Sequence, residues 1–329
     1  MASQITPNTF STTTGPAPKT TIFFISGNPG LIGYYHPFLS LLAQYLTRET
    51  SFRIHGSSLG GFEIGKESPK DLDLEDQIRF VQENLNALMT EKNNASPKDS
   101  NGNTNRGKVI LIGHSVGAYM AMEILNRHRD PPFDIIGGVM LFPTVKDIAA
   151  SPSGQKLTVL PRLALIVSLF ARLLTFLLPV SILRAVIRAV MNDPPSHALD
   201  TTCLFLKSRG GVRQALHMAA DEMRTITSDK WGDDVWGAAR EPVAKLFFYF
   251  GRNDHWVAEQ TRDEIVALRG REGGPTMVVC EEGLPHAFCL SEFLEVPLWI
   301  SCAFWLTWIE HSDTMARKVA GMIGGIVGV

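Results

Sequence analysis

A buried strand that ends in a glycine-bounded serine is the feature that most constrains how this chain can fold. Residues 108–112 read Lys-Val-Ile-Leu-Ile, a short apolar run, and residues 113–117 read Gly-His-Ser-Val-Gly. A helical pattern follows, from Val116 to His128. Such a strand-to-helix turn is so tight that only glycine fits before and after the serine, and it lifts the Ser115 hydroxyl above the sheet. The pattern therefore predicts a strand, a sharp turn that presents Ser115, and a helix.

The rest of the core alternates β-prone runs with helical patterns. Apolar runs predict further strands at residues 21–26, 52–56, 245–250 and 277–280, and one that ends near Phe142. Strands that alternate with helices favour a parallel sheet covered on both faces. The chain is therefore expected to belong to the α/β class.

The alternation breaks after Asp147 and returns at Lys245, which places an insertion between two strands of the sheet. The apolar stretch 298–309 is too short to span a membrane and predicts a final helix packed on the sheet. The predicted units are a disordered N-terminal lead (1–20), the first part of the core (21–147), a hydrophobic and basic insertion (148–240), the second part of the core (241–312) and a C-terminal tail (313–329).

Composition argues against several classes of function. Apolar residues make up 45% of the chain and the formal net charge is −2, so no overall charge draws it to nucleic acid. The 4 cysteines show no CxxC pair and no metal-ligand spacing, so we expect reduced thiols, no metal and no organic cofactor. Residues 1–20 lack the apolar core of a secretory signal, which favours the cytosolic side.

Two further residues complete a candidate catalytic set with Ser115. A serine hydroxyl becomes a good nucleophile only when a base takes its proton, and an acid must orient that base. Asp254 follows the strand that ends at Phe250, and His286 follows the strand that ends at Cys280. In the α/β-hydrolase fold, nucleophile, acid and histidine occur in this order along the chain. We therefore predict that fold, with a mostly parallel central sheet and a helical cap insertion, and a triad of Ser115, Asp254 and His286.

Three other residues compete for these roles. His255 is a rival base, although it follows the wrong strand. His114 adjoins the nucleophile, where we expect it to pack beneath the turn. Asp147 is a rival acid, because some relatives of the fold place the acid after the preceding strand.

The reaction also needs donors for negative charge. The tetrahedral intermediate of acyl transfer carries an oxyanion that requires two fixed N–H groups. The backbone N–H of Val116 is one candidate. The loop at residues 27–30 (Gly-Asn-Pro-Gly) is expected to supply the other, and Asn28 is the better donor because Pro29 has no N–H.

The insertion has the pattern of a segment that contacts lipid. Between Asp147 and Asp193 every charged residue is basic. Residues 163–180 are almost wholly apolar, but Arg172 and Pro179 argue against a spanning helix. After Pro179 the apolar residues share one helical face with arginines opposite, which is typical of a helix lying in a membrane interface. The alternative is a cap that buries these residues against the core. The predicted contact residues are Leu163, Leu165, Phe170, Leu174, Phe176, Ile182 and Val186.

Several of these motifs together resemble one family. Residues 27–30 with Tyr34-Tyr35 close behind, residues 113–119, residues 251–256 and residues 286–288 are similar to the lipid droplet-associated hydrolases. The resemblance covers residues 21–288, and its Asn-Pro-Gly turn and Asp-His-Trp element are more specific than the serine turn. It implies the same triad, a place on lipid droplets and endoplasmic reticulum membranes, and sterol esters or other neutral lipid esters as substrates.

We therefore expect a serine hydrolase that cleaves lipid esters through an acyl-enzyme, on the cytosolic face of a lipid droplet or of the endoplasmic reticulum. Two alternatives stay open at this point. An acyltransferase would use the same triad to deliver the acyl group to an alcohol. A droplet-binding protein with little or no turnover would keep only the fold.

Overall fold

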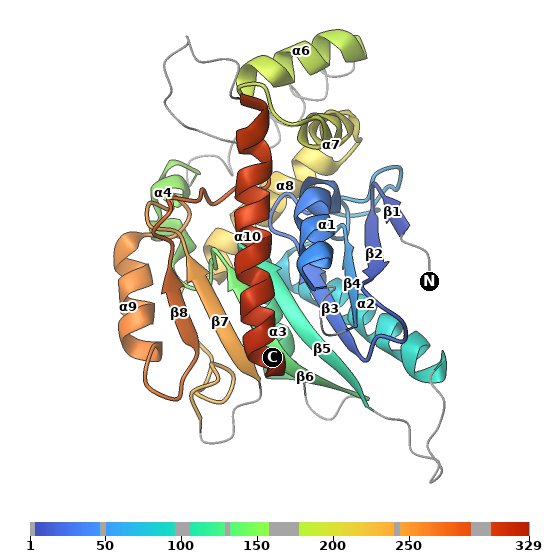
Figure 1. The fold of residues 1–329 in the computed structure, drawn as a ribbon. Helices are drawn as coiled ribbons and strands as arrows, with labels where there is room; N and C mark the ends of the chain where they lie inside the picture. Colours follow the sequence, from blue (N-terminus) through green and yellow to red (C-terminus); the bar gives the residue numbers. More distant parts are fainter. Residues whose placement is uncertain are drawn as a thin grey trace.

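The computed structural model describes residues 4–46, 51–95, 106–128, 132–157, 178–239, 244–290 and 304–328. The strands are β1 (Gln4–Thr6), β2 (Thr9–Thr13), β3 (Thr20–Ile25), β4 (Phe52–Ser57), β5 (Gly107–His114), β6 (Phe133–Leu141), β7 (Lys245–Phe250) and β8 (Thr276–Val279). Within the described ranges they form one 8-stranded sheet in the order β1-β2-β4-β3-β5-β6-β7-β8. Figure 1 shows this sheet with helices packed on both faces.

The sheet is parallel from β4 through β8, and β1 and β2 pair antiparallel at its edge. Every residue of β3 is buried, and so is every residue of β5 except Lys108, as expected for strands covered on both faces. The register pairs Ile25 with Gly113 and His114 with Leu141. The carboxyl ends of β3, β5 and β6 therefore lie side by side, and the loops that follow them meet.

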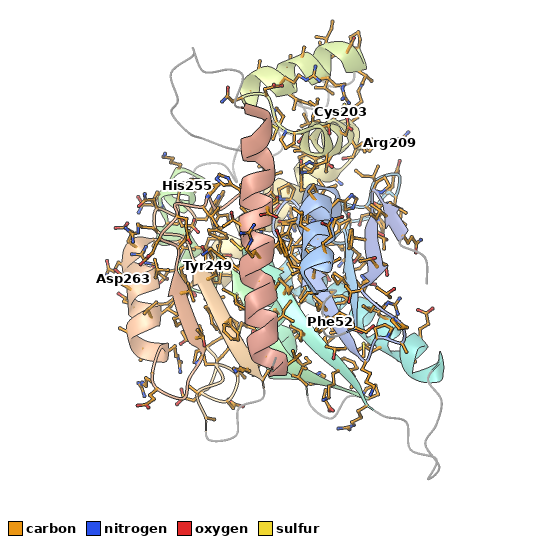
Figure 2. The ribbon with its side chains drawn as sticks, in the orientation of Figure 1. Phe52, Cys203, Arg209, Tyr249, His255 and Asp263 are labelled. Atoms are coloured by element: carbon orange, nitrogen blue, oxygen red, sulfur yellow. The ribbon has the colours of Figure 1, made fainter. Side chains whose placement is uncertain are left out.

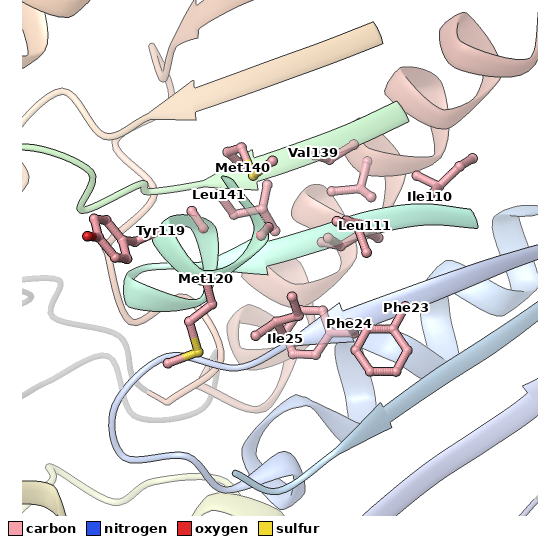
Figure 3. Close-up of a cluster of buried hydrophobic side chains, with 14 of the residues drawn as sticks. Phe23, Phe24, Ile25, Ile110, Leu111, Tyr119, Met120, Val139, Met140 and Leu141 are labelled. Atoms are coloured by element: carbon pink, nitrogen blue, oxygen red, sulfur yellow. The ribbon is translucent and has the colours of Figure 1, made fainter. Parts of the chain in front are cut away.

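The core beneath those loops is apolar and close-packed. Helix α3 (Val116–Arg127) lies against β3, β5 and β6, and its residues Tyr119 and Met120 are buried with strand residues such as Ile25 and Leu141. Figure 3 shows side chains of this cluster on β3, β5 and β6, with Tyr119 and Met120 at the start of α3. Packing of this kind fixes the position of the turn between β5 and α3.

Helices α1 (His36–Tyr45) and α10 (Phe304–Val327) lie side by side on one face of the sheet (Figure 1). On the other face α3 packs against α2 (Leu74–Ala95), and α9 (Glu259–Arg269) lies beside β8 (Figure 1). Most of the segment 313–329, which the sequence analysis gave as a C-terminal tail, belongs to α10, which ends at Val327. Its buried residues recur at helical spacing, which lets them pack on the sheet: Met315, Ala316, Val319, Met322 and Ile323.

The prediction of a disordered lead over residues 1–20 is wrong for residues 4–13. Strand β2 pairs with β4, and β1 pairs with β2. Phe10 is 1% exposed and anchors the pair in the core. Asn8, in the turn, donates from Nδ2 to the carbonyl of Ile64 and accepts from its N–H. One aromatic side chain and one amide therefore order a segment whose polar composition suggested disorder.

The regular structure described in the insertion is helical, followed by turns from residue 226 to 239, and we refer to residues 148–240 as the cap. It contains the 3-10 helix η3 (Ile148–Ala150) and helices α4 (Pro152–Leu157), α6 (Val180–Val190), α7 (Ser196–Lys207) and α8 (Gly211–Thr225). Helix α7 packs on the 3-10 helix η1 (Ile32–Tyr35), which follows β3, and α8 packs on η3. The cap thus covers the carboxyl edge of the sheet (Figure 1).

Two other expectations concern membranes and thiols. Across the described ranges, each helix is too short or too polar to reach from one side of a bilayer to the other. Cys203, Cys280 and Cys289 are buried free thiols, whereas Cys302 lies outside the described residues.

Candidate active site

Ser115 occupies a strained turn between β5 and α3. Its backbone has φ 56° and ψ −124°, a conformation that costs a non-glycine residue free energy. A Cβ at Gly117 would lie 2.3 Å from the carbonyl oxygen of Ile25, and one at Gly113 would lie 2.4 Å from the carbonyl oxygen of Gly117. Glycine is therefore required on both sides of Ser115, as the sequence analysis argued.

His286 connects Ser115 to Asp254. The Nε2 atom of His286 lies 2.9 Å from Ser115 Oγ, and its Nδ1 atom lies 2.7 Å from Asp254 Oδ2. A carboxylate can only accept, so Nδ1 carries the proton that it donates to Asp254, and Nε2 of the neutral ring accepts from the Ser115 hydroxyl. The structure brings all three predicted residues together in the orientation that general-base activation of a serine requires.

Asp254 is buried but stays ionised. Burial alone would raise the pKa of Asp254, but the electrostatic attraction and hydrogen bond of His286, together with the Trp256 N–H that donates to Oδ1, bring this pKa below its ordinary value. The ring of Phe142 lies 5.6 Å from that of His286, and the ring of Trp256 lies 6.4 Å from it. These aromatic neighbours limit the access of water to the imidazole.

A second hydrogen-bonded chain, which sequence analysis missed, runs beneath the triad. The Gly27 N–H donates to Tyr35 Oη at 3.2 Å, and Tyr35 Oη lies 2.8 Å from His114 Nδ1. His114 Nε2 lies 2.8 Å from the backbone carbonyl of His286. Because that carbonyl can only accept, His114 carries its proton on Nε2 and accepts the Tyr35 hydroxyl on Nδ1. Burial lowers the pKa of His114 to about 3, so the ring stays neutral.

The two predicted oxyanion donors lie in segments that adjoin Ser115. Val116 is the first residue of α3, so its N–H has no partner within the helix. A Cβ at Gly27 would lie 3.0 Å from Ser115 Cβ, which places the loop that contains Asn28 against the nucleophile. The Asn28 side chain points toward α8, where Nδ2 donates to the Ala215 carbonyl and to Glu222 Oε1, each at 3.0 Å.

Glu222 is another residue that sequence analysis missed. It is 5% exposed, and burial raises its pKa to about 8. It shares a face of α8 with Met218, four residues before it, and Ile226 follows four residues after it just past the helix end; both are fully buried. The sequence does hold one signal for Glu222. It is an acidic residue at a position where the helical spacing predicts an apolar one.

The rival residues lie elsewhere. His255 is exposed and lies near α4 (Figure 2). Its backbone carbonyl accepts the N–H of Ser153 in α4. Asp147 has a left-handed backbone conformation at the start of η3. The acid bonded to His286 is Asp254. Among the described residues, no three His, Cys, Asp or Glu side chains are grouped so that they could hold a metal ion.

The predicted lipid-contacting residues fall into two groups. Leu163, Leu165, Phe170, Leu174 and Phe176 lie outside the described residues. Ile182 and Val186 lie on α6, where they are 49% and 42% exposed. Leu183 and Ile187, on the same helix, are buried against Leu199 and Cys203 of α7. Some apolar residues of α6 therefore pack against α7, and others are exposed to solvent.

A model of the lipid-droplet associated hydrolase family matches residues 18–289. The chain belongs to this family. Lipid droplet-associated hydrolase of Gallus gallus is 30% identical over 296 residues, which cover 86% of this chain and 84% of the relative. That of Mus musculus is 29% identical over 290 residues, which cover 83% and 81%. Membership of the family makes the chain a hydrolase and confirms the resemblance seen in the sequence.

Solved structures show the same fold. A haloalkane dehalogenase from Bradyrhizobium elkani aligns with a TM-score of 0.58 at 14% identity, covering 100% of this chain and 97% of that one. A carboxylesterase structure from the thaumarchaeon Nitrososphaera aligns with a TM-score of 0.56 at 16% identity, covering 97% and 95%. The predicted α/β-hydrolase fold with its mostly parallel sheet is thus confirmed.

Proposed function

We propose that this hydrolase is a serine esterase that cleaves lipid esters, either sterol esters or other neutral lipid esters, through an acyl-enzyme. The observation that carries the proposal is the unbroken chain of hydrogen bonds from Asp254 through His286 to Ser115, at 2.7 and 2.9 Å. A serine held by its backbone at the end of a strand and hydrogen-bonded to an oriented base is poised for nucleophilic attack.

The reaction follows from these positions. Ser115 Oγ attacks the ester carbonyl carbon while His286 Nε2 takes its proton. The tetrahedral intermediate collapses, the bond to the leaving alcohol breaks, and His286 returns the proton to the alcohol oxygen. Water then attacks the acyl-enzyme, with His286 again acting first as base and then as acid. Asp254 stabilises the imidazolium that forms in each half of the cycle.

The oxyanion is stabilised by the N–H groups of Val116 and Asn28 in this proposal. In the loop after β3, the Gly27 N–H already donates to Tyr35, and Pro29 has no N–H to offer. Asn28 is thus the residue of that turn best suited to act opposite Val116. Two such donors in a dry site contribute much of the rate acceleration of acyl transfer.

The proposed site of action is the surface of a lipid droplet or of the endoplasmic reticulum membrane. The curated relatives are named for lipid droplets. Helix α6 supports a surface contact, since its exposed apolar residues share a helix with Arg184 and Arg188: Val180, Ile182, Val186 and Val190. A helix of this type can rest its apolar side in lipid while its arginines reach the headgroups.

The decisive experiment uses a fluorophosphonate probe and a short soluble ester. The wild type should be labelled and should hydrolyse the ester, whereas Ser115→Ala should do neither. Equal labelling of the two proteins would refute Ser115 as the nucleophile. A panel of sterol and glycerol esters of different acyl length, run with the same control, then identifies the substrate. Adding an alcohol acceptor shows whether the acyl group goes to water.

The acid is tested separately. Asp254→Asn should lower kcat by about a thousandfold or more. The substitution keeps the size of the side chain but disturbs the tautomer of His286. Asp147→Asn should change kcat less than about twofold. The reverse result would transfer the role to Asp147.

A further inference from the structure

Glu222 is a buried acid that the proposed reaction does not use. It lies on α8 of the cap, with an exposed fraction of 5%. None of the ion pairs formed by the described residues includes Glu222, and its carboxyl accepts a hydrogen bond from Asn28 Nδ2. Burial without a cation disfavours the carboxylate and explains why its pKa is raised to about 8.

Asn28 connects this acid to the proposed oxyanion site. The Ala215 carbonyl can only accept, so it fixes the amide orientation and directs Nδ2 toward both Ala215 and Glu222. The backbone of the same loop lies against Ser115, because a Cβ at Gly27 would come within 3.0 Å of Ser115 Cβ. One side chain therefore fastens the loop beside the nucleophile to a helix of the cap.

The surrounding charges do not compensate an anion at Glu222. The negative charge of Asp221, the preceding residue on α8, raises the pKa of Glu222 further. Asp221 itself accepts from Arg224 and from the Leu74 N–H at the start of α2. On α2, which packs against α8, Glu75 pairs with Arg127, and Asp76 pairs with Lys70 and Arg79. On α7 Asp200 pairs with Arg184, and Asp147 begins η3. Lys207 of α7 donates to the Leu178 carbonyl.

We propose that Glu222 is a positioning residue that holds the Asn28 loop in its productive place, and that it does so as the uncharged acid. This inference rests on the proposed function. A neutral carboxyl accepts the Asn28 hydrogen bond without adding negative charge beside the position where the oxyanion develops. Once ionised, it places a negative charge one hydrogen bond away from Asn28, whose N–H is proposed to stabilise the oxyanion, so turnover falls.

The test measures kcat and KM for a short soluble ester between pH 5 and 9.5. Glu222→Ala removes one of the two acceptors of Asn28 Nδ2 and leaves one buried N–H of that amide unpaired, so it should lower kcat about tenfold with little change in KM. Glu222→Gln keeps an acceptor oxygen and should restore kcat at pH 7 to within about threefold of the wild type. The wild type should lose activity above about pH 8, and Glu222→Gln should not.

Asp221→Asn is the matched control, since it removes the adjacent charge on the same helix. It should keep the alkaline loss of activity, with its midpoint moved slightly to lower pH. If wild type and Glu222→Gln lose activity at the same alkaline midpoint, or if the wild type shows no alkaline loss, the proposal for Glu222 is overturned while the proposed function stands. If Glu222→Ala does not fold, the comparison of the pH profiles of the wild type and Glu222→Gln decides the proposal alone. Full activity of Ser115→Ala would overturn the proposed function and this inference with it.

Discussion

His114 Nε2 donates a hydrogen bond to the backbone carbonyl of His286 at 2.8 Å, so the residue before the nucleophile supports the loop that carries the base. Its other ring nitrogen accepts from Tyr35, whose oxygen also accepts the Gly27 N–H. The three segments that make up the site are thus held together by side chains that never meet the substrate in the proposed reaction.

Removal of the Tyr35 hydroxyl should therefore slow the reaction. Tyr35→Phe leaves the Gly27 N–H and His114 Nδ1 without partners in a buried site, and we expect kcat to fall about fivefold to tenfold with KM nearly unchanged. Tyr34→Phe is the control, because its hydroxyl bonds to Thr202 of the cap. Steady-state kinetics on a short ester measure both. A Tyr35→Phe enzyme with the wild-type kcat would show that this chain of hydrogen bonds is not needed.

The glycine after the nucleophile should be intolerant of any side chain. Gly117→Ala places a methyl group 2.3 Å from the Ile25 carbonyl oxygen, and we expect the free energy of unfolding to fall by about 3 kcal/mol or more. Gly321→Ala, at an exposed position of α10 with open space around it, should instead gain up to about 1 kcal/mol. Urea denaturation of both variants tests the contrast, and equal stabilities would contradict it.

Surface binding should depend on the exposed side of α6. The double variant Ile182→Asp/Val186→Asp should reduce binding to phospholipid-coated oil droplets by about tenfold or more, because each buried aliphatic side chain contributes about 1.5 kcal/mol or more. Hydrolysis of a soluble ester should continue. Leu268→Asp on α9, a leucine that is 49% exposed, is the control and should bind as the wild type does. Flotation assays measure binding, and unchanged flotation of the double variant would exclude α6 as the contact.

Stability should fall on mild acidification. Burial lowers the pKa of His114 to about 3 and that of His55 to about 4. The unfolded chain takes up these protons near pH 6.5, whereas the folded chain does not, so the stability present above pH 6.5 is lost as the pH falls toward 4. Each histidine contributes a loss of at most about 2 kcal/mol at pH 5. Urea midpoints at pH 7.5 and 5 measure the loss, and His55→Gln should reduce it. An identical loss in that variant would contradict the assignment to His55.

The residues that the sequence analysis grouped into one site, and that the structure brings together, obey local or topological rules. The turn at Ser115 follows from steric limits within five residues, and those limits are visible as two glycines. Asp254 and His286 were found because parallel strands bring their carboxyl ends to one edge, so residues after different strands meet there. Both features are independent of how the cap folds.

The contacts that the sequence did not predict depend on long-range packing. Asn28 and Glu222 are 194 positions apart in the chain, and their contact exists only because α8 folds over the loop after β3. The order of residues 4–13 likewise depends on an edge of the sheet supplied by β4 and on the burial of Phe10. Such contacts cannot be predicted from the composition of one segment, because they depend on a second segment that lies far away in the chain.

The cap leaves the sheet at the end of β6 and returns at β7, and these two strands are neighbours in the sheet. It therefore takes the place of an ordinary crossover connection. In evolutionary terms, such a segment can lengthen, shorten or be exchanged among related enzymes without altering strand order or the spacing of Ser115, Asp254 and His286. A related enzyme with a different cap would need new hydrogen-bond acceptors for the Asn28 side chain.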